Sequence, residues 1–128
     1  HLSGTDVVGS MVVFINGEKN TNEYRRFKIK IDQNDDALAM NEVLTRRFNH
    51  PEWPSPNLIL VDGPVRSHPK AIIIGLEKKL ETIVLANGAK INLPKSNMGL
   101  QLLMAIRDES HRFAQSYHHV LRKKKMIE

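Results

Sequence analysis

The stretch Leu58-Ile59-Leu60-Val61-Asp62-Gly63 decides the fold. Its first four residues are apolar without alternation, and Asp62-Gly63 ends the run with a turn dipeptide. A short strand of this kind is typical of one that is buried on both faces. Because a predicted helix precedes it, the stretch predicts a central parallel strand of an α/β domain, with a carboxylate at its C-terminal end.

Upstream, the pattern predicts an antiparallel hairpin. Residues 7–15 form a β-rich apolar run that ends at Asn16-Gly17, and residues 23–31 alternate. One side of the second strand is apolar and the other is cationic, with Phe27, Ile29 and Ile31 opposite Arg26, Lys28 and Lys30. The two strands, joined by a polar turn of about 7 residues, are therefore expected to present one cationic face to solvent.

Between the hairpin and the central strand, a helix is expected to run from residues 34–36 to Phe48. Asn34, Asp35 and Asp36 suit a helix start, and Met40, Leu44 and Phe48 recur at four-residue spacing. Three prolines follow, and Trp53 among them is interpreted as a loop anchor rather than as a platform for base stacking.

Downstream, the sequence predicts a strand, a hairpin and a long helix. The strand covers residues 71–76, and the hairpin joins residues 82–85 to 90–93 through Asn87-Gly88. The helix covers about residues 99–124, with an apolar stripe at Leu103, Ile106, Ser110, Phe113, Ala114, Tyr117 and Leu121. The predicted fold class is an α/β domain with a mixed sheet flanked by helices.

Length and composition limit the class of protein. The 128 residues suit one domain, and there is no signal peptide pattern and no apolar run near the ~18 residues of a membrane span. The absence of cysteine excludes thiolate sites and fits a reducing compartment, so a cytoplasmic location is expected. The net charge of +5 is compatible with a polyanionic partner, although solvated basic faces explain it equally well.

Two residues are candidates for chemistry. Asp62 lies where open α/β sheets place their ligands, and strand-end carboxylates suit Mg²⁺ or Mn²⁺, although Asp62 could simply open a turn. His111 shares a helix stripe with Arg107 and His118 at the border between core and solvent, where it could relay a proton or be a plain surface histidine. We expect Glu109 and Arg112 to form only a solvated surface pair.

Several segments together are similar to a known family. These segments are residues 8–14 (VGSMVVF), 23–27 (EYRRF), Asp35-Asp36 with 42–47 (EVLTRR), 58–63 (LILVDG), 74–76 with Lys78-Lys79, and 106–114 (IRDESHRFA). The combination resembles the C-terminal endonuclease domain of UvrC, the incision subunit of bacterial nucleotide excision repair. The resemblance runs almost end to end.

The resemblance implies an RNase H-like fold and cutting of DNA on the 5′ side of a lesion, after loading by UvrB and indirectly UvrA. It implies Mg²⁺ or Mn²⁺ as cofactor, with Asp62 as a metal ligand and with Asp62, His111 and Asp36 as the catalytic residues. Damaged double-stranded DNA is the implied partner. Its backbone would be followed by the hairpin face and the C-terminal basic run, namely Arg26, Lys28, Lys30, Arg122, Lys123 and Lys124.

Two departures from the family are expected. The first catalytic aspartate of the family would precede His1 by three residues, together with the start of the first strand, and a helix that follows the family's Asp-Gly is missing here. We therefore expect residues 1–128 to be a single domain truncated at the N-terminus, with a basic tail at about 122–128 and weak or absent activity by itself. The alternatives are a catalytically incomplete RNase H-like domain that binds DNA or a repair partner, and a basic α/β domain with unknown partners.

Overall fold

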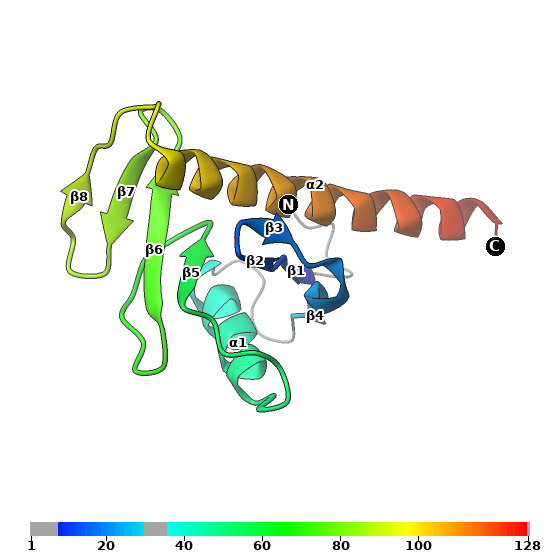
Figure 1. The fold of residues 1–128 in the computed structure, drawn as a ribbon. Coiled ribbons are helices and arrows are strands. Elements are labelled where there is room, and N and C mark those ends of the chain that lie inside the picture. The colour runs from blue at the N-terminus through cyan, green and yellow to red at the C-terminus, as the bar shows by residue number, and fades with distance from the viewer. Residues whose placement is uncertain (1–7, 30–35, 128) are drawn as a thin grey trace.

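The computed structural model describes the backbone of residues 8–29 and 36–127, and the side chains of 8–29 and 38–116. The described residues form two α-helices and eight short strands, in the predicted order apart from the additional pair β2–β3 (Figure 1). The elements are β1 (Val8–Met11), β2 (Phe14–Ile15), β3 (Glu18–Lys19), the 3₁₀ turn η1 (Thr21–Glu23), β4 (Arg25–Lys28), α1 (Asp36–Phe48), β5 (Leu58–Val61), β6 (Ile72–Glu77), β7 (Thr82–Leu85), β8 (Lys90–Ile91) and α2 (Met98–Ile127).

The C-terminal half contains a mixed sheet of order β5-β6-β7-β8. Strand β5 runs parallel to β6, and the other neighbours are antiparallel. The predicted hairpin with Asn87-Gly88 is confirmed as β7–β8, and the predicted mixed α/β class is confirmed. No helix lies between β5 and β6, where residues 62–71 form a loop.

The N-terminal half consists of two small antiparallel pairs, β1–β4 and β2–β3. The expected pairing of the first two long strands is present, but the connection is more than a polar turn. It contains the β2–β3 hairpin, whose turn residues Asn16 and Gly17 have φ of 53° and 81°. Positive φ at both positions is the geometry that an Asn-Gly turn supplies.

The predicted two-sided pattern of the second long strand is confirmed for its described residues. Phe27 and Ile29 are buried, whereas Arg26 and Lys28 are exposed. Ile31 and Lys30, which extend the two sides of the pattern, lie outside the described residues.

The prediction that Leu58–Val61 is a central strand is wrong for the described part of the chain. Strand β5 pairs with β6 on one side only, and β1 pairs only with β4, so β5 is an edge strand. Leu58 is 45% exposed and only Val61 is buried. Leu60 packs against the core under α2, and residues 58–61 line a cleft, so neighbours other than strands account for part of the apolar run.

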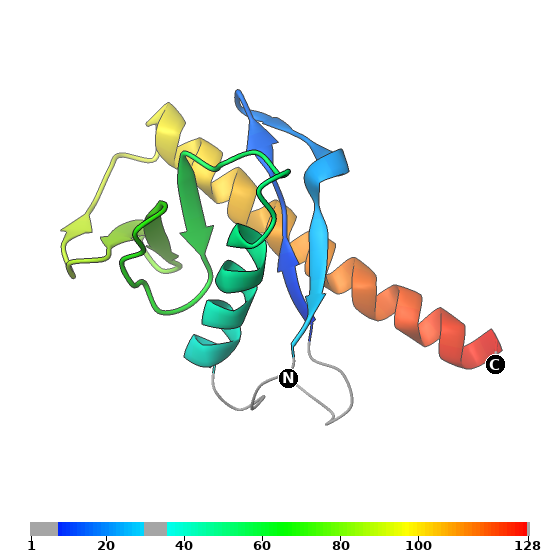
Figure 2. The ribbon, with the colours of Figure 1, turned by 90° about the horizontal axis from the view of Figure 1, so that it is seen from below.

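The helices lie on opposite faces of the strands. Figure 1 shows α2 across one face of both halves, and Figure 2 shows α1 on the other face, beneath the boundary between β5 and β1. The main core lies under the first turns of α2, where Leu100 is fully buried beside Ile74, Ile83 and Leu103. Asn97 caps this helix, because its side-chain oxygen accepts from the Leu100 N–H at 3.0 Å.

Candidate functional site

The side chains of Asp62 and His111 are in contact, although 49 positions separate the two residues in the sequence. The Nε2 atom of His111 lies 3.1 Å from Oδ2 of Asp62. Asp62 follows the buried Val61 at the end of β5, and Gly63 turns the chain away with a φ of 155°, which side-chain-bearing residues rarely adopt. Strand β5 and the middle of α2 therefore bring together a carboxylate and an imidazole.

The pair is open to solvent. The Asp62 side chain is 68% exposed and that of His111 is 38% exposed. Because an ionised carboxylate only accepts hydrogen bonds, the contact needs a proton on Nε2. A neutral His111 would then keep Nδ1 as an acceptor, which is the arrangement of a base that a carboxylate orients.

Both residues lie on the rim of a cleft of about 480 Å³. Residues of β1 and β2, of α1, of β5 with the segment before it, and of α2 line this cleft, and most of the lining surface is apolar. Since β1 and β5 share no ladder, the cleft separates the N-terminal half from the mixed sheet.

Arg107, one turn before His111, also lines the cleft but is already engaged. Its guanidinium binds Glu81 in the β6–β7 turn and lies 3.1 Å from Oδ1 of Asp108. The hydrogen bond to Glu81 raises the pKa of Arg107. Arg107 and His111 lie one turn apart on α2, as predicted, and the side chain of His118, the third residue of the predicted stripe, lies outside the described residues.

For the remaining predicted site residues outside the hairpin face, the structure describes the backbone at most and not the side chains. Asp36 begins α1 as predicted, but its side chain lies outside the described residues, as does all of Asp35. Arg122, Lys123 and Lys124 lie on the backbone of α2, and their side chains also lie outside the described residues. The roles predicted for these residues stay predictions.

The cationic hairpin face is partly used for packing. The guanidinium of Arg26 lies 3.9 Å from the ring centre of Phe113 and donates to the Ser116 hydroxyl at 2.9 Å. Lys28 is exposed, and its carbonyl accepts a hydrogen bond from Arg46 at 2.5 Å. Arg26 therefore joins β4 to α2, a role that its place in the alternating pattern did not indicate.

Trp53 is packed as the loop-anchor interpretation expects. Its ring stacks on His50 with centroids 3.8 Å apart, and Arg25 lies 4.7 Å from the ring centre. Phe27 approaches the same ring from the core, at 6.1 Å between centroids. Trp53 therefore secures the segment after α1 against β4.

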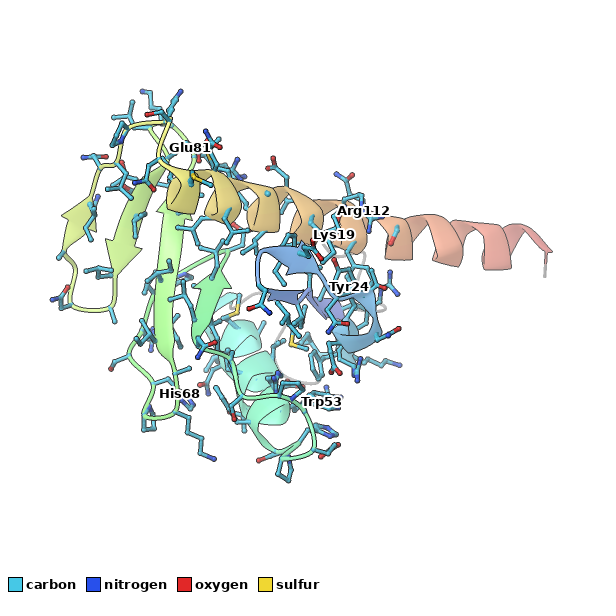
Figure 3. The ribbon with its side chains drawn as sticks, viewed as in Figure 1. Lys19, Tyr24, Trp53, His68, Glu81 and Arg112 are labelled. Atoms are coloured by element: carbon cyan, nitrogen blue, oxygen red, sulfur yellow. The ribbon has the colours of Figure 1, made fainter. Side chains whose placement is uncertain are left out.

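Glu109 is a buried carboxylate whose burial was not predicted from its sequence pattern. Its side chain is only 4% exposed, so the expectation of a solvated pair with Arg112 is wrong. Arg112 donates two hydrogen bonds of 2.7 Å to it, and the Tyr24 hydroxyl donates one of 2.9 Å. Lys19 adds an ion pair at 3.5 Å (Figure 3). The physical reason is that β3 and β4 lie over this turn of α2 and cover the carboxylate.

This environment shifts two pKa values in opposite directions. The hydrogen bonds from Arg112 lower the pKa of Glu109 to about 2. Burial, together with the hydrogen bond to Glu109, raises the pKa of Tyr24 to about 12. The signal in the sequence was a carboxylate three residues after Ile106, close to the apolar stripe of α2.

The donor atoms at the Asp62–His111 pair suit a hard divalent cation only in part. Mg²⁺ is commonly bound by one or two carboxylates and keeps several waters, so the exposed Asp62 carboxylate fits as one ligand. Among the side chains that the structure describes, those of residues 8–29 and 38–116, no group of three acidic or histidine residues could hold a metal ion. A full cation site at Asp62 needs further oxygen ligands.

The fold and this pair define a mixed α/β domain with a carboxylate–imidazole site at a strand end. A family profile described as the UvrC RNAse H endonuclease domain matches residues 1–115. The chain is 41% identical to UvrABC system protein C of Chlorobium phaeobacteroides over 144 residues, and also 41% identical to that of Thermotoga maritima over 138 residues. The chain belongs to the UvrC RNase H endonuclease domain family, as the sequence resemblance predicted.

The matches also show how much of the relatives the chain represents. The alignments cover 100% and 99% of this chain but only 23% and 24% of the two relatives, so the chain spans about a quarter of their length. The first alignment has 144 positions for 128 residues, so at least 16 positions have no residue in this chain. In the described part of the chain, neither helix has a stretch apolar and long enough to cross a bilayer.

Proposed function

We propose that this chain is a divalent-metal-dependent DNA endonuclease domain that makes the 5′ incision of nucleotide excision repair. The observation that supports the proposal is the 3.1 Å contact between Asp62 and His111 at the rim of a cleft. The chain belongs to an endonuclease domain family. Metal-assisted phosphodiester hydrolysis uses carboxylates and a proton acceptor, and Asp62 and His111 are side chains of these two kinds.

Each residue of the pair has a separate task in this proposal. Asp62 holds Mg²⁺ or Mn²⁺ through its exposed carboxylate, and the cation, when bound, lowers the pKa of water and offsets charge on the phosphate. His111 orients the attacking water or accepts its proton at the ring nitrogen that does not face Asp62. Asp36 is a third catalytic residue in this proposal, on the basis of the family resemblance.

The partners we propose are damaged double-stranded DNA and UvrB, with UvrA acting indirectly. The lysine and arginine surplus, 19 against 14 acidic residues, supports contact with a phosphate backbone. Lys28 is exposed on β4, and Arg26 carries its charge at the same strand while it packs on Phe113. Lys30 and residues 122–124 are included on their charge alone. Such contacts position DNA without reading its bases.

A nicking assay tests the proposal. The natural polypeptide that carries this chain is incubated with UvrB and a lesion-bearing duplex, with and without Mn²⁺. Asp62→Ala and His111→Ala should each lower incision on the 5′ side at least a hundredfold, while Glu77→Gln, a change in an exposed ion pair with Lys90, should leave it unchanged. Cutting that persists in both active-site variants contradicts the assignment.

One observation favours a second candidate function. The described residues bring only one carboxylate and one histidine to the site, which is the minimum for a metal ligand and too little for a closed cation site. The alternative is a catalytically incomplete RNase H-like domain that binds DNA or a repair partner. It predicts lesion-duplex binding without Mn²⁺-dependent nicking in the unmodified protein, and the same assay decides between the two.

A further inference from the structure

The turn between β6 and β7 begins with two adjacent lysines, Lys78-Lys79, at the edge of the sheet where Asp62 lies. Strands β5 and β6 are parallel and Val61 is paired with Gly75, so Asp62 lies about level with Leu76. The first lysine is the second residue after Leu76, which places its backbone roughly 7 Å further along the strand direction. Both the lysines and the candidate site therefore lie at the carboxyl ends of neighbouring parallel strands, the edge at which α/β sheets bind ligands.

An ion pair attaches this turn to the helix that carries His111. Glu81, the last residue of the turn, binds the guanidinium of Arg107, and both side chains are mostly buried (Figure 3). Arg107 precedes His111 by one helical turn on α2. The charge of Glu81 is therefore matched by Arg107 rather than by the two lysines, and the turn has a fixed place beside the Asp62–His111 pair.

The two lysines are available to an anion. Both are exposed, and neither ammonium group forms an ion pair or a hydrogen bond with a described residue. Lys90 in the same sheet differs, because it lies 3.2 Å from the carboxylate of Glu77. Lysines 78 and 79 therefore bring two uncompensated positive charges to this edge of the sheet.

Lys90 also projects from the other face of the sheet. Leu60 and Leu76 pack against the core under α2, so they lie on the face that α2 covers. Because successive side chains of a strand alternate between faces, Glu77 and its partner Lys90 point away from α2. Lys90 is therefore a matched control, exposed like the two lysines of the turn but directed away from the site.

We propose that Lys78 and Lys79 bind the phosphate backbone of DNA beside the Asp62–His111 pair and so fix where the cut strand lies. This inference rests on the proposed DNA substrate. Phosphates of one strand follow one another every 3.4 Å along the duplex axis, so the offset of roughly 7 Å, extended by a lysine side chain, reaches a phosphate about two to four nucleotides from the cut bond. An ammonium group binds phosphate as a point charge and does not read the base.

The salt dependence of binding tests this contact without reference to cutting. The natural polypeptide that carries this chain is titrated with a lesion-bearing duplex, without divalent metal, between about 50 and 200 mM salt. Lys78→Gln combined with Lys79→Gln should reduce the slope of log affinity against log salt by about 2, one for each lost phosphate contact, whereas Lys90→Gln should reduce it by less than about 0.5. An unchanged slope in the double variant, or an equal reduction with Lys90→Gln, overturns the proposal.

Uncharged linkages locate the contact on the DNA. A methylphosphonate is placed at one position at a time on the 5′ side of the lesion, which removes a single phosphate charge. In the unmodified protein, one or two adjacent positions should weaken binding about threefold or more, and the same positions should have no further effect in the double variant. Lys78→Arg with Lys79→Arg keeps both charges and should keep this sensitivity. Losses that simply add to those of the double variant at every position contradict the contact.

Incision kinetics separate this role from a structural one. The double variant should raise the KM for the lesion duplex roughly tenfold and change kcat less than about threefold, because the contact is made equally before and during the reaction. Its thermal unfolding midpoint should match that of the unmodified protein, since both lysines are exposed. A lowered midpoint together with an unchanged KM would overturn the proposal.

The proposed function and this contact can fail separately. If the unmodified protein binds the duplex but does not nick it, the endonuclease function fails, and the salt slopes and the methylphosphonate positions still decide the role of the lysines. If nicking is normal and the double variant matches the unmodified protein in both binding measurements, only the lysine contact fails. A protein that binds no DNA at all would overturn both.

Discussion

Replacing Glu109 by glutamine should destabilise the fold in a manner that depends on pH. The pKa of Glu109 is about 2 in the folded state against 4.5 for an ordinary glutamate, mainly because Arg112 donates two hydrogen bonds to it. A difference of this size corresponds to at most about 3.5 kcal/mol of stability, since one pKa unit is worth about 1.4 kcal/mol. Arg112 is 59% exposed, so solvation of its freed charge reduces the loss.

The direction follows from the lowered pKa. A carboxylate with a depressed folded-state pKa contributes its full stability above about pH 4.5, and this contribution disappears as the pH falls toward 2. We therefore expect the unfolding free energies of the unmodified chain and of Glu109→Gln to differ by about 2–3 kcal/mol at pH 7. The two values should converge near pH 2.

Urea unfolding followed by circular dichroism at pH 7, 4.5, 3 and 2 measures this difference. Glu77→Gln serves as the matched control, because Glu77 is 51% exposed in its pair with Lys90 and should give a difference below about 0.5 kcal/mol. A difference between the unmodified chain and Glu109→Gln that stays constant from pH 7 to pH 2 would refute the reasoning. It would show that the carboxylate contributes by packing alone.

Further substitutions test the packing around the site. Gly9→Ala should cost about 1–3 kcal/mol, because a Cβ there would overlap Val43 of α1, and Gly9→Ala combined with Val43→Ala should recover part of the loss in thermal unfolding. Leu100→Ala should cost about 2–5 kcal/mol in the same assay, since Leu100 is fully buried; a cost below about 1 kcal/mol would show that the core under α2 collapses freely. Glu81→Ala should lower the unfolding midpoint, because it removes the half-buried ion-pair partner of Arg107 and leaves its guanidinium with Asp108 alone; an unchanged midpoint would contradict this.

The local elements were predictable because each has its own periodic signal. The four-residue spacing of Met40, Leu44 and Phe48 predicted α1, and the Asn87-Gly88 dipeptide predicted the turn between β7 and β8. Both signals depend only on residues near in sequence, so tertiary contacts did not override them. The long helix was also predicted, within three residues at its C-terminal end, at Ile127 rather than 124.

The relations between elements were harder to predict. The apolar run at β5 was interpreted as a strand with neighbours on both sides, but the structure has a neighbour on one side and a cleft on the other. An apolar side chain is stabilised by removal from water, whether its neighbour is a helix, the lining of a cleft or another strand. The sequence pattern could not distinguish these partners.

The candidate site was predicted in part. Asp62 at a strand end and His111 on the helix border were each predicted as candidate residues, the family resemblance implied that both are catalytic, and the structure brings them to 3.1 Å. The surroundings of Glu109 were not predicted, because its partners Tyr24 and Lys19 lie 85 and 90 positions away in the sequence. Burial of a charge depends on such distant contacts, and local patterning alone cannot reveal them.

The most direct test of the central claim is to map the bond that is cut. The natural polypeptide carrying this chain, with Mn²⁺ and UvrB, is given an end-labelled duplex with one lesion, and the products are resolved at single-nucleotide resolution. We predict an incision on the 5′ side of the lesion that disappears with Asp62→Asn, a change that removes the charge and keeps the shape of the side chain. An incision of equal rate at the same bond in Asp62→Asn would contradict the claim.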